Sequence, residues 1–146
     1  MEGGDLSNVT PPRFLFVFEG LIGRLDSVAA KKEQMYRRLK RHKKAAACWA
    51  IEPVAVSYLW DMAWRHKLAV DLVTYLPYSD ELEERMEKEH LPFASVLAFE
   101  SPEELCQRLA YMPYVHRIYF SEPRRPFIFG DRGEYVDSSS VFDPLS

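Results

Sequence analysis

Residues 14–18 form an uninterrupted apolar run, FLFVF, which Glu19 and Gly20 close. A strand with one face in water alternates apolar and polar residues, whereas an unbroken run of β-formers is typical of a strand buried on both faces of a parallel sheet. Such a strand needs cover on both sides. The run therefore predicts an α/β fold in which these residues form the first and central strand.

Helical and strand patterns alternate along the rest of the chain, with short links between them. The expected elements after the first strand are helices at 27–47 and from 53 to about 67, a strand at 68–74, a helix at 80–90, a strand at 94–99, a helix at 101–112, and strands at 116–120 and 126–129. Asp26 or Ser27 can cap the first helix, and a Ser-Pro-Glu-Glu capping box begins the last one at Ser101. This order predicts a Rossmann-like three-layer α/β sandwich around a mostly parallel five-stranded sheet.

A chain of 146 residues with 47% hydrophobic residues is of the usual size for one domain with its own core. We expect a flexible leader at 1–13, a single domain at 14–136 that contains a basic helical insert at 27–47, and a flexible tail at 137–146. Cys48 and Cys106 are far apart and lack metal-ligand spacing, and no export signal or membrane-spanning segment is evident. These features predict a cytoplasmic protein without a membrane partner, and they leave a homo-oligomer open.

Charge is strongly concentrated in residues 31–44, KKEQMYRRLKRHKK, which hold eight Lys or Arg against one Glu in a chain of net charge -3. A helix here would present a positive face that could bind nucleic acid or another acidic partner with salt-dependent affinity. The candidate polyanion-binding residues are Lys31, Lys32, Arg37, Arg38, Lys40, Arg41, Lys43 and Lys44. A solvated face or a protein contact is the alternative interpretation of the same residues. Trp49, Trp60 and Trp64 favour core or subunit packing over base stacking.

Residues 17–20, Val-Phe-Glu-Gly, resemble the Asp-x-Asp-Gly motif that ends the first strand of the haloacid dehalogenase-like (HAD-like) fold. The resemblance covers about residues 14–130. It places Val17 at the nucleophilic aspartate and Glu19 at the general acid/base, and it keeps the glycine as Gly20. Because a valine can neither attack phosphorus nor hold Mg²⁺, the resemblance implies a degenerate member of the superfamily.

The other motifs of the resemblance are partly matched. Thr74 stands where the superfamily has a phosphate-binding hydroxyl at the end of the second strand. The phosphate-binding lysine has no counterpart between residues 91 and 113, where Arg108 is the one basic side chain. The acidic metal-binding motif falls on Glu122, with Asp131 as a competing placement.

In open α/β sheets, ligands usually bind beyond the carboxyl ends of the strands. That rule predicts a crevice lined by Glu19, Gly20, Thr74, Tyr75, Glu100, Ser121 and Glu122. The alternative is that Glu19 and Thr74 only end strands and cap turns. Asp71, in the middle of an apolar strand pattern, would need a basic partner such as Arg65 or Lys67, or a position at an exposed edge.

Two functions remain in view. The first is a noncatalytic HAD-like binding or assembly module that uses its basic helix to engage nucleic acid or another acidic partner. The second is an atypical Mg²⁺-dependent phosphatase or nucleotide-processing hydrolase, with Glu19 as candidate metal ligand and Thr74 with Glu122 or Asp131 as further catalytic candidates. The valine at position 17 favours the first. The four histidines lie on different elements and predict no metal site.

Overall fold

The structure, a computed structural model, describes residues 12–136. Its main elements, in chain order, are β1 (Arg13–Val17), β2 (Gly23–Arg24), α2 (Ser27–Arg38), α3 (His42–Ala47), β3 (Ala50–Ile51), α4 (Pro53–Trp60), β4 (Ala69–Thr74), α5 (Ser79–Lys88), β5 (Val96–Ala98), α6 (Pro102–Arg108), β6 (Val115–Phe120) and β7 (Gly133–Tyr135). A π-helical turn, Asp61–Arg65, extends α4, and 3₁₀ turns follow α6 at Leu109–Tyr111 and precede β7 at Gly130–Arg132. The predicted leader and tail lie outside the described residues, apart from Pro12 and Arg13.

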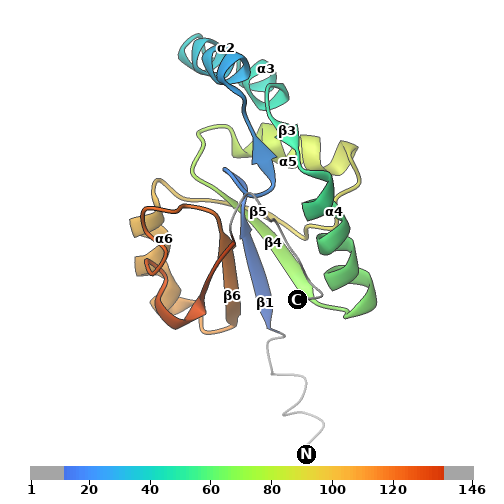
Figure 1. Cartoon of the computed structure of the whole chain (residues 1–146), viewed down its shortest axis with the longest axis vertical. Helices are drawn as coiled ribbons and strands as arrows, with labels where there is room; N and C mark the ends of the chain where they lie inside the picture. The colour runs from blue at the N-terminus through green and yellow to red at the C-terminus, as the bar shows by residue number, and fades with distance from the viewer. Residues whose placement is uncertain (1–11, 137–146) are drawn as a thin grey trace, which may run out of the picture.

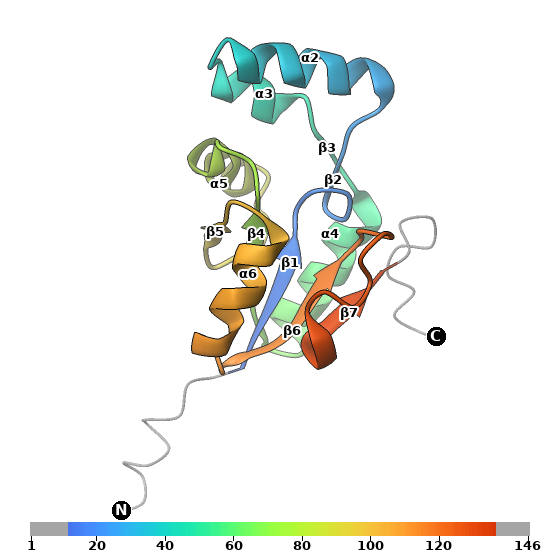
Figure 2. The same ribbon diagram turned by 90° about the vertical axis from the view of Figure 1, so that its left-hand side faces the viewer.

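Five parallel strands form the main sheet in the order β5-β4-β1-β6-β7, with β1 at its centre (Figures 1 and 2). This confirms both the predicted central strand and the parallel sheet. The crossovers place α6 on one face and α4 with α5 on the other (Figure 2). The three-layer architecture is therefore the predicted one.

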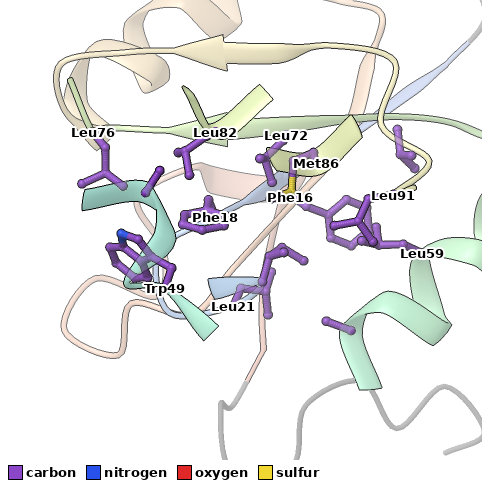
Figure 3. Packing of buried hydrophobic residues seen from close by; sticks show 14 of the residues in the cluster. Phe16, Phe18, Leu21, Trp49, Leu59, Leu72, Leu76, Leu82, Met86 and Leu91 are labelled. Carbon is purple, nitrogen blue, oxygen red and sulfur yellow. The ribbon is translucent and has the colours of Figure 1, made fainter. Parts of the chain in front are cut away.

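Two hydrophobic clusters fill the spaces on the two faces of the sheet. Phe14, Phe16 and Phe18 belong to the cluster beneath α4 and α5, whereas Leu15 and Val17 belong to the cluster beneath α6. The alternation follows from the two-residue period of a strand, and it explains why the run contains no polar residue. Figure 3 shows the first cluster, where Phe16 and Phe18 lie among apolar side chains of the surrounding helices and strands.

The link from β1 to the insert is a tight turn. Gly20 has a φ of +86°, a conformation that glycine adopts without strain. The Phe18 carbonyl accepts hydrogen bonds from the backbone amides of Leu21, Ile22 and Gly23. A Cβ at Gly23 would meet the Phe18 ring at 2.3 Å, so this close approach requires glycine. The chain then enters a short antiparallel pair, β2 with β3, which the sequence analysis did not predict.

The prediction of one helix at 27–47 is wrong. The insert consists of two helices, α2 and α3, because the chain turns at Lys40, whose φ is +57°. The turn folds α3 back against α2 and buries Ala45 and Ala46. A single straight helix of this sequence would carry those alanines away from the core cluster that they join. Figures 1 and 2 place the two helices beyond the carboxyl end of β1.

The predicted strand at 126–129 is also wrong. Phe127 is 87% exposed in a turn, while Phe129 packs edge to face on Phe120 with ring centroids 5.2 Å apart. Pro123 and Pro126 lack the amide hydrogens that a strand ladder needs at their positions. The fifth strand is β7, which pairs with β6 in parallel register from Ile118 opposite Gly133.

Asp71 has a different partner from those predicted. It lies on β4, between β1 and β5, so it is not at an edge, and it is 3% exposed. Arg13 donates two hydrogen bonds of 2.6 Å to its carboxylate, and Ser95 donates a third of 2.8 Å. The partner is thus Arg13 and not the predicted Arg65 or Lys67. Arg13 is also the first residue of β1, which begins one residue before the predicted domain boundary.

Two smaller predictions are confirmed. Asp26 caps α2 by accepting a hydrogen bond from the Ala29 amide, and Ser101 caps α6 by accepting one from the Glu104 amide. Within residues 12–136, no helix is long and apolar enough to cross a membrane.

Candidate functional site

The carboxyl ends of the three central strands meet at a cavity of about 250 Å³. β1 ends there at Val17 and continues to Glu19, β4 is followed by Tyr75, and β6 is followed by Ser121 and Glu122. The remaining lining residues come from the start of α6 and from the segments around β6 and before β7: Pro102, Phe120, Arg125, Ile128 and Phe129. The cavity therefore occupies the position that the topology predicts for a ligand site.

Glu19 has one oxygen in a hydrogen-bond network and one without a partner. Its Oε2 accepts a hydrogen bond of 2.8 Å from the Tyr75 amide and one of 3.1 Å from the Thr74 hydroxyl. The Thr74 oxygen in turn accepts a bond of 3.1 Å from the Leu76 amide. Its Oε1 is shielded from solvent and has no hydrogen-bond partner among residues 12–136. The glutamate is thus held in a fixed orientation by one of its two oxygens.

Burial raises the pKa of Glu19 to about 7, because a carboxylate loses hydration when it is removed from water. The hydrogen bonds from the Tyr75 amide and the Thr74 hydroxyl lower the pKa, as does the charge of Arg37, but they do not offset the desolvation. Burial and the nearby Glu19 charge also raise the pKa of the Tyr75 phenol. Near neutral pH the Glu19 carboxyl therefore exchanges readily between its neutral and charged forms.

The walls of the cavity are largely apolar. Val17, Phe120 and Phe129 are buried members of the cluster beneath α6, and Ile128 packs against that cluster. Ser121 supplies the second polar atom of interest, since its hydroxyl oxygen is buried and has no hydrogen-bond partner in the described part of the chain. The site thus combines an apolar wall with two unsatisfied oxygens.

The charged groups at the rim are engaged in ion pairs. Glu122 pairs with Arg124 at 3.1 Å and also accepts a hydrogen bond from the Arg124 amide, and these contacts lower the pKa of the Glu122 carboxyl. Arg125 pairs with Glu103 on α6. Both pairs are substantially exposed, so they stabilise the conformation of the cavity rim only weakly.

Four of the seven residues predicted for the crevice line the cavity together: Glu19, Tyr75, Ser121 and Glu122. Thr74 lies behind Glu19 and is fully buried, and Gly20 forms the turn after β1. Glu100 is exposed and does not line the cavity. Asp131 lines a separate groove with Pro113 and other residues near the amino end of β6, so the structure does not bring it to Glu19.

The sequence analysis missed the apolar wall. Phe129 and Ile128 were interpreted as part of a strand, and nothing in their local pattern distinguishes an aromatic strand from a turn that closes a cavity. Phe120 lies in a predicted strand but has no local feature that marks it as a pocket residue. Topology alone located the polar residues, since each follows a strand directly.

The residues around the cavity do not fit a resident Mg²⁺ ion. Magnesium demands near-ideal octahedral oxygen coordination, usually through one or two ionised carboxylates together with waters and phosphate. Val17 offers no oxygen, Thr74 and Tyr75 hold one oxygen of Glu19, and both Glu122 oxygens accept bonds from the Arg124 side chain. Within residues 12–136 no group of three or more His, Cys, Asp or Glu side chains could hold a metal ion.

The basic insert is anchored beside this end of the molecule by a buried glutamate. Glu33 on α2 is 1% exposed; it accepts two hydrogen bonds from Arg37, of 2.9 and 2.7 Å, and a short one from the Tyr78 hydroxyl. The same hydroxyl accepts a bond of 2.9 Å from the Trp49 indole. Arg37 is therefore an anchor of the insert, whereas all eight predicted polyanion-binding side chains remain exposed to some degree.

Comparison with solved structures identifies the fold. A HAD family enzyme from Bacteroides thetaiotaomicron, an aspartate-to-alanine mutant in complex with magnesium and inorganic phosphate, superposes with a TM-score of 0.58 over 93% of this chain and 99% of its own. This chain has the HAD-like fold. A candidate β-phosphoglucomutase from Thermotoga maritima superposes with a TM-score of 0.57 over 86% of this chain and 85% of its own.

Both structures are 11% identical to this chain, so the likeness is one of fold. No protein-family model and no curated protein gives a significant match to the sequence. The fold comparison confirms the predicted HAD-like, Rossmann-like architecture. It leaves the function of the site at the carboxyl ends of the strands to be argued from its own residues.

Proposed function

We propose that this chain is a noncatalytic HAD-like binding module. The observation that carries the proposal is Val17 at the carboxyl end of β1, where a covalent phosphatase needs an attacking carboxylate. Val17 is 4% exposed and packs in the cluster beneath α6, so the position belongs to the hydrophobic core. Glu19 stands two residues beyond that position, and Thr74 and Tyr75 fix the orientation of its carboxyl.

The surface for the partner is the insert formed by α2 and α3. Its segment 31–44 holds eight of the chain's 19 Lys and Arg but one of its 22 Asp and Glu, and that one, Glu33, is buried. Among residues 12–136, six of the eight cations have no ion-pair or ring contact: Lys31, Lys32, Arg38, Lys40, Arg41 and Lys43. Such a group of unpaired cations favours an acidic partner.

Apolar side chains lie among these cations. Val28, Met35 and Leu39 are 63%, 45% and 60% exposed, and their spacing on α2 places them on one side of the helix. A nucleic-acid backbone offers no apolar contact for them, whereas an acidic protein surface with apolar side chains does. We therefore favour an acidic protein partner, and nucleic acid is the other outcome of the test.

The absence of catalysis is tested with p-nitrophenyl phosphate and Mg²⁺, using the full chain. We expect no hydrolysis above that of buffer alone, for the wild type and for Glu19→Gln. Magnesium-dependent turnover that Glu19→Gln abolishes would instead support the atypical phosphatase or nucleotide-processing hydrolase.

The binding surface is tested by neutralising four unpaired cations in one variant: Arg38, Lys40, Arg41 and Lys43, each replaced by Gln. The matched control replaces four cations outside the insert by Gln: Arg65, Lys67, Lys88 and Arg108. Both variants lose the same charge, so a general effect of net charge is held constant.

The probes are a peptide of alternating Glu and Leu, a DNA duplex and a single-stranded RNA, each titrated at low and moderate salt. We expect the peptide to bind most tightly, more weakly as salt rises, and about tenfold more weakly to the insert variant than to the control variant. A DNA or RNA preference with a log-log salt slope of about -0.7 to -0.9 per phosphate contact would identify nucleic acid as the partner. Equal binding by the two variants would refute the assignment of the insert.

A further inference from the structure

An open groove lies between the two helices of the basic insert. α2 and α3 lie side by side beyond the sheet (Figures 1 and 2), and the groove between them has a volume of about 590 Å³. Val28, Ala29 and Tyr36 line it from α2, and Ala47 and Cys48 line it from the carboxyl end of α3. Since a helix rises about 1.5 Å per residue, the groove follows α2 for about 12 Å, which is the length of about two turns of a second helix.

The walls of the groove are apolar, although the insert around it is basic. Val28 is 63% exposed and Ala47 is also exposed, while Ala29, Tyr36 and Cys48 are half-buried. Burying apolar surface against another apolar surface is favourable, and exposed apolar side chains in a concave site are typical of interaction sites. The groove therefore favours an occupant with apolar side chains of its own.

The charges of the groove stand at defined places. Lys32 lies on the α2 wall and has no ion-pair partner among residues 12–136. Lys44 lies on the α3 wall, with its ammonium group 5.7 Å from the centre of the Tyr36 ring. Asp26, the one acid among the described lining residues, lies at the amino end of α2, which its carboxylate caps. An occupant should therefore carry carboxylates on two flanks, one opposite each lysine.

The helical walls decide the backbone conformation of the occupant. The backbone groups of α2 and α3 bond within each helix, so an extended peptide would find no strand edge to pair with. A helix satisfies its own backbone groups, and its side-chain ridges pack into grooves between other helices. Apolar residues at helical spacing would enter the groove, and acidic residues on both sides of that stripe would reach Lys32 and Lys44.

We propose that the groove between α2 and α3 binds an acidic amphipathic helix of a partner protein. This helix inserts its apolar stripe between Val28 and Ala47 and pairs its carboxylates with Lys32 and Lys44. The helix belongs to the acidic protein partner proposed above, so its binding rests on that proposed function. It needs the groove in addition, whereas the proposed function needs only the exposed cations.

The first test compares two peptides of equal Leu and Glu composition, each long enough for about four helical turns, on the full wild-type chain. Leu recurs at helical spacing in one peptide and alternates with Glu in the other. We expect the helical peptide to bind about tenfold or more tightly, because only its Leu side chains form one stripe that enters the groove. On binding, the amide chemical shifts of Ala29 and Ala47 should move and that of Ala110 should not.

Equal affinity of the two peptides would overturn the helix while leaving the acidic partner in place. Binding of neither peptide would overturn the helix together with the proposed function. Displacement of the helical peptide by duplex DNA, or by vesicles of phosphatidylcholine and phosphatidylserine in equal parts, would assign the groove to another class of partner and would also overturn the proposal.

The second test uses two variants that each add one negative charge. Ala47→Glu places a carboxylate in the groove, and Ala110→Glu, the matched control, places one on the exposed 3₁₀ turn after α6. We expect Ala47→Glu to bind the helical peptide about tenfold more weakly than Ala110→Glu does, because its carboxylate narrows the groove and repels those of the peptide.

The two proposals can fail separately in this test. Weak binding by the four-cation variant together with equal binding by Ala47→Glu and Ala110→Glu would refute the groove and leave the proposed function standing. The comparison of the two peptides uses the wild type, so it decides the matter even if Ala47→Glu fails to fold.

Discussion

The buried Glu19 carboxyl makes the stability of this fold depend on pH in a direction opposite to that of an ordinary paired carboxylate. Its pKa is raised from 4.5 to about 7 by burial, so the folded chain holds a proton that the unfolded chain releases at lower pH. Below pH 4.5 both states are protonated and the group costs nothing. As pH rises through 7, the folded state must place a charge in a dry site, and stability is lost.

The size of the effect follows from linkage. The folded and unfolded pKa values lie about 2.5 pH units apart, and each unit corresponds to about 1.4 kcal/mol. The free energy of unfolding should therefore fall by about 3 kcal/mol between pH 4.5 and 8.5 because of this residue alone. Glu19→Gln keeps the shape and removes the ionisation. The stability difference, wild type minus variant, should therefore decrease by about 3 kcal/mol over the same range.

Urea unfolding monitored by tryptophan fluorescence and circular dichroism at a series of pH values measures this difference. Glu83→Gln, on the exposed side of α5, is the control and should show a nearly constant difference. Only the change of this stability difference with pH is interpreted. A constant effect of the glutamine side chain on the hydrogen bonds with Thr74 and Tyr75 therefore does not affect the result. A difference that stays constant within about 0.5 kcal/mol, or that increases with pH, would refute the assignment of a raised pKa to Glu19.

Three further predictions concern stability. Arg13→Met should lower the free energy of unfolding by about 3–5 kcal/mol, because it leaves the buried Asp71 carboxylate uncompensated, whereas Asp71→Leu should lower it less, because Arg13 is partly exposed; the double variant should be less destabilised than Arg13→Met, and additive effects in urea unfolding would contradict this. Tyr78→Phe should lower the free energy of unfolding by about 3 kcal/mol, because it removes the hydroxyl that accepts a hydrogen bond from the Trp49 indole and donates one to the buried Glu33. An unchanged midpoint of urea unfolding would argue against that network. Val17→Asp should lower the free energy of unfolding by about 3–5 kcal/mol, since it buries a charge in the core, and it should yield no phosphatase activity. Measurable magnesium-dependent turnover by this variant would show that position 17 alone limits catalysis.

The sequence predicted the fold well where the pattern is local. The FLFVF run identified the central strand because burial on both faces requires an unbroken apolar sequence, and Asp26 and Ser101 mark the starts of two of the helices that follow. The prediction of the fifth strand failed because the local pattern there does not decide the structure. Residues 127–129, Phe-Ile-Phe, have a local preference for a strand but lie in a turn, whereas β7, Gly-Glu-Tyr, has no such preference and forms because it pairs with β6. Tertiary pairing overrides propensity at this edge.

The basic insert shows another limit of sequence analysis. A count of charges assigns residues 31–44 to the surface, and the cations are indeed exposed, but it cannot reveal that Glu33 is buried. Its partner Tyr78 lies 45 residues away, and Arg37 belongs to the same network. Because these contacts are long-range, the break of the predicted helix at Lys40 could not be foreseen from periodicity either.

At the candidate site, sequence and topology located Glu19 but not its chemistry. The valine at position 17 bears on catalysis only in the light of a motif, whereas the structure shows that this position belongs to the hydrophobic cluster beneath α6. Burial also removes water from the Glu19 carboxyl and raises its pKa to about 7. The apolar wall and the buried carboxyl thus lie side by side in one cavity, and a ligand suited to this cavity should be chosen for its apolar body as much as for its charge.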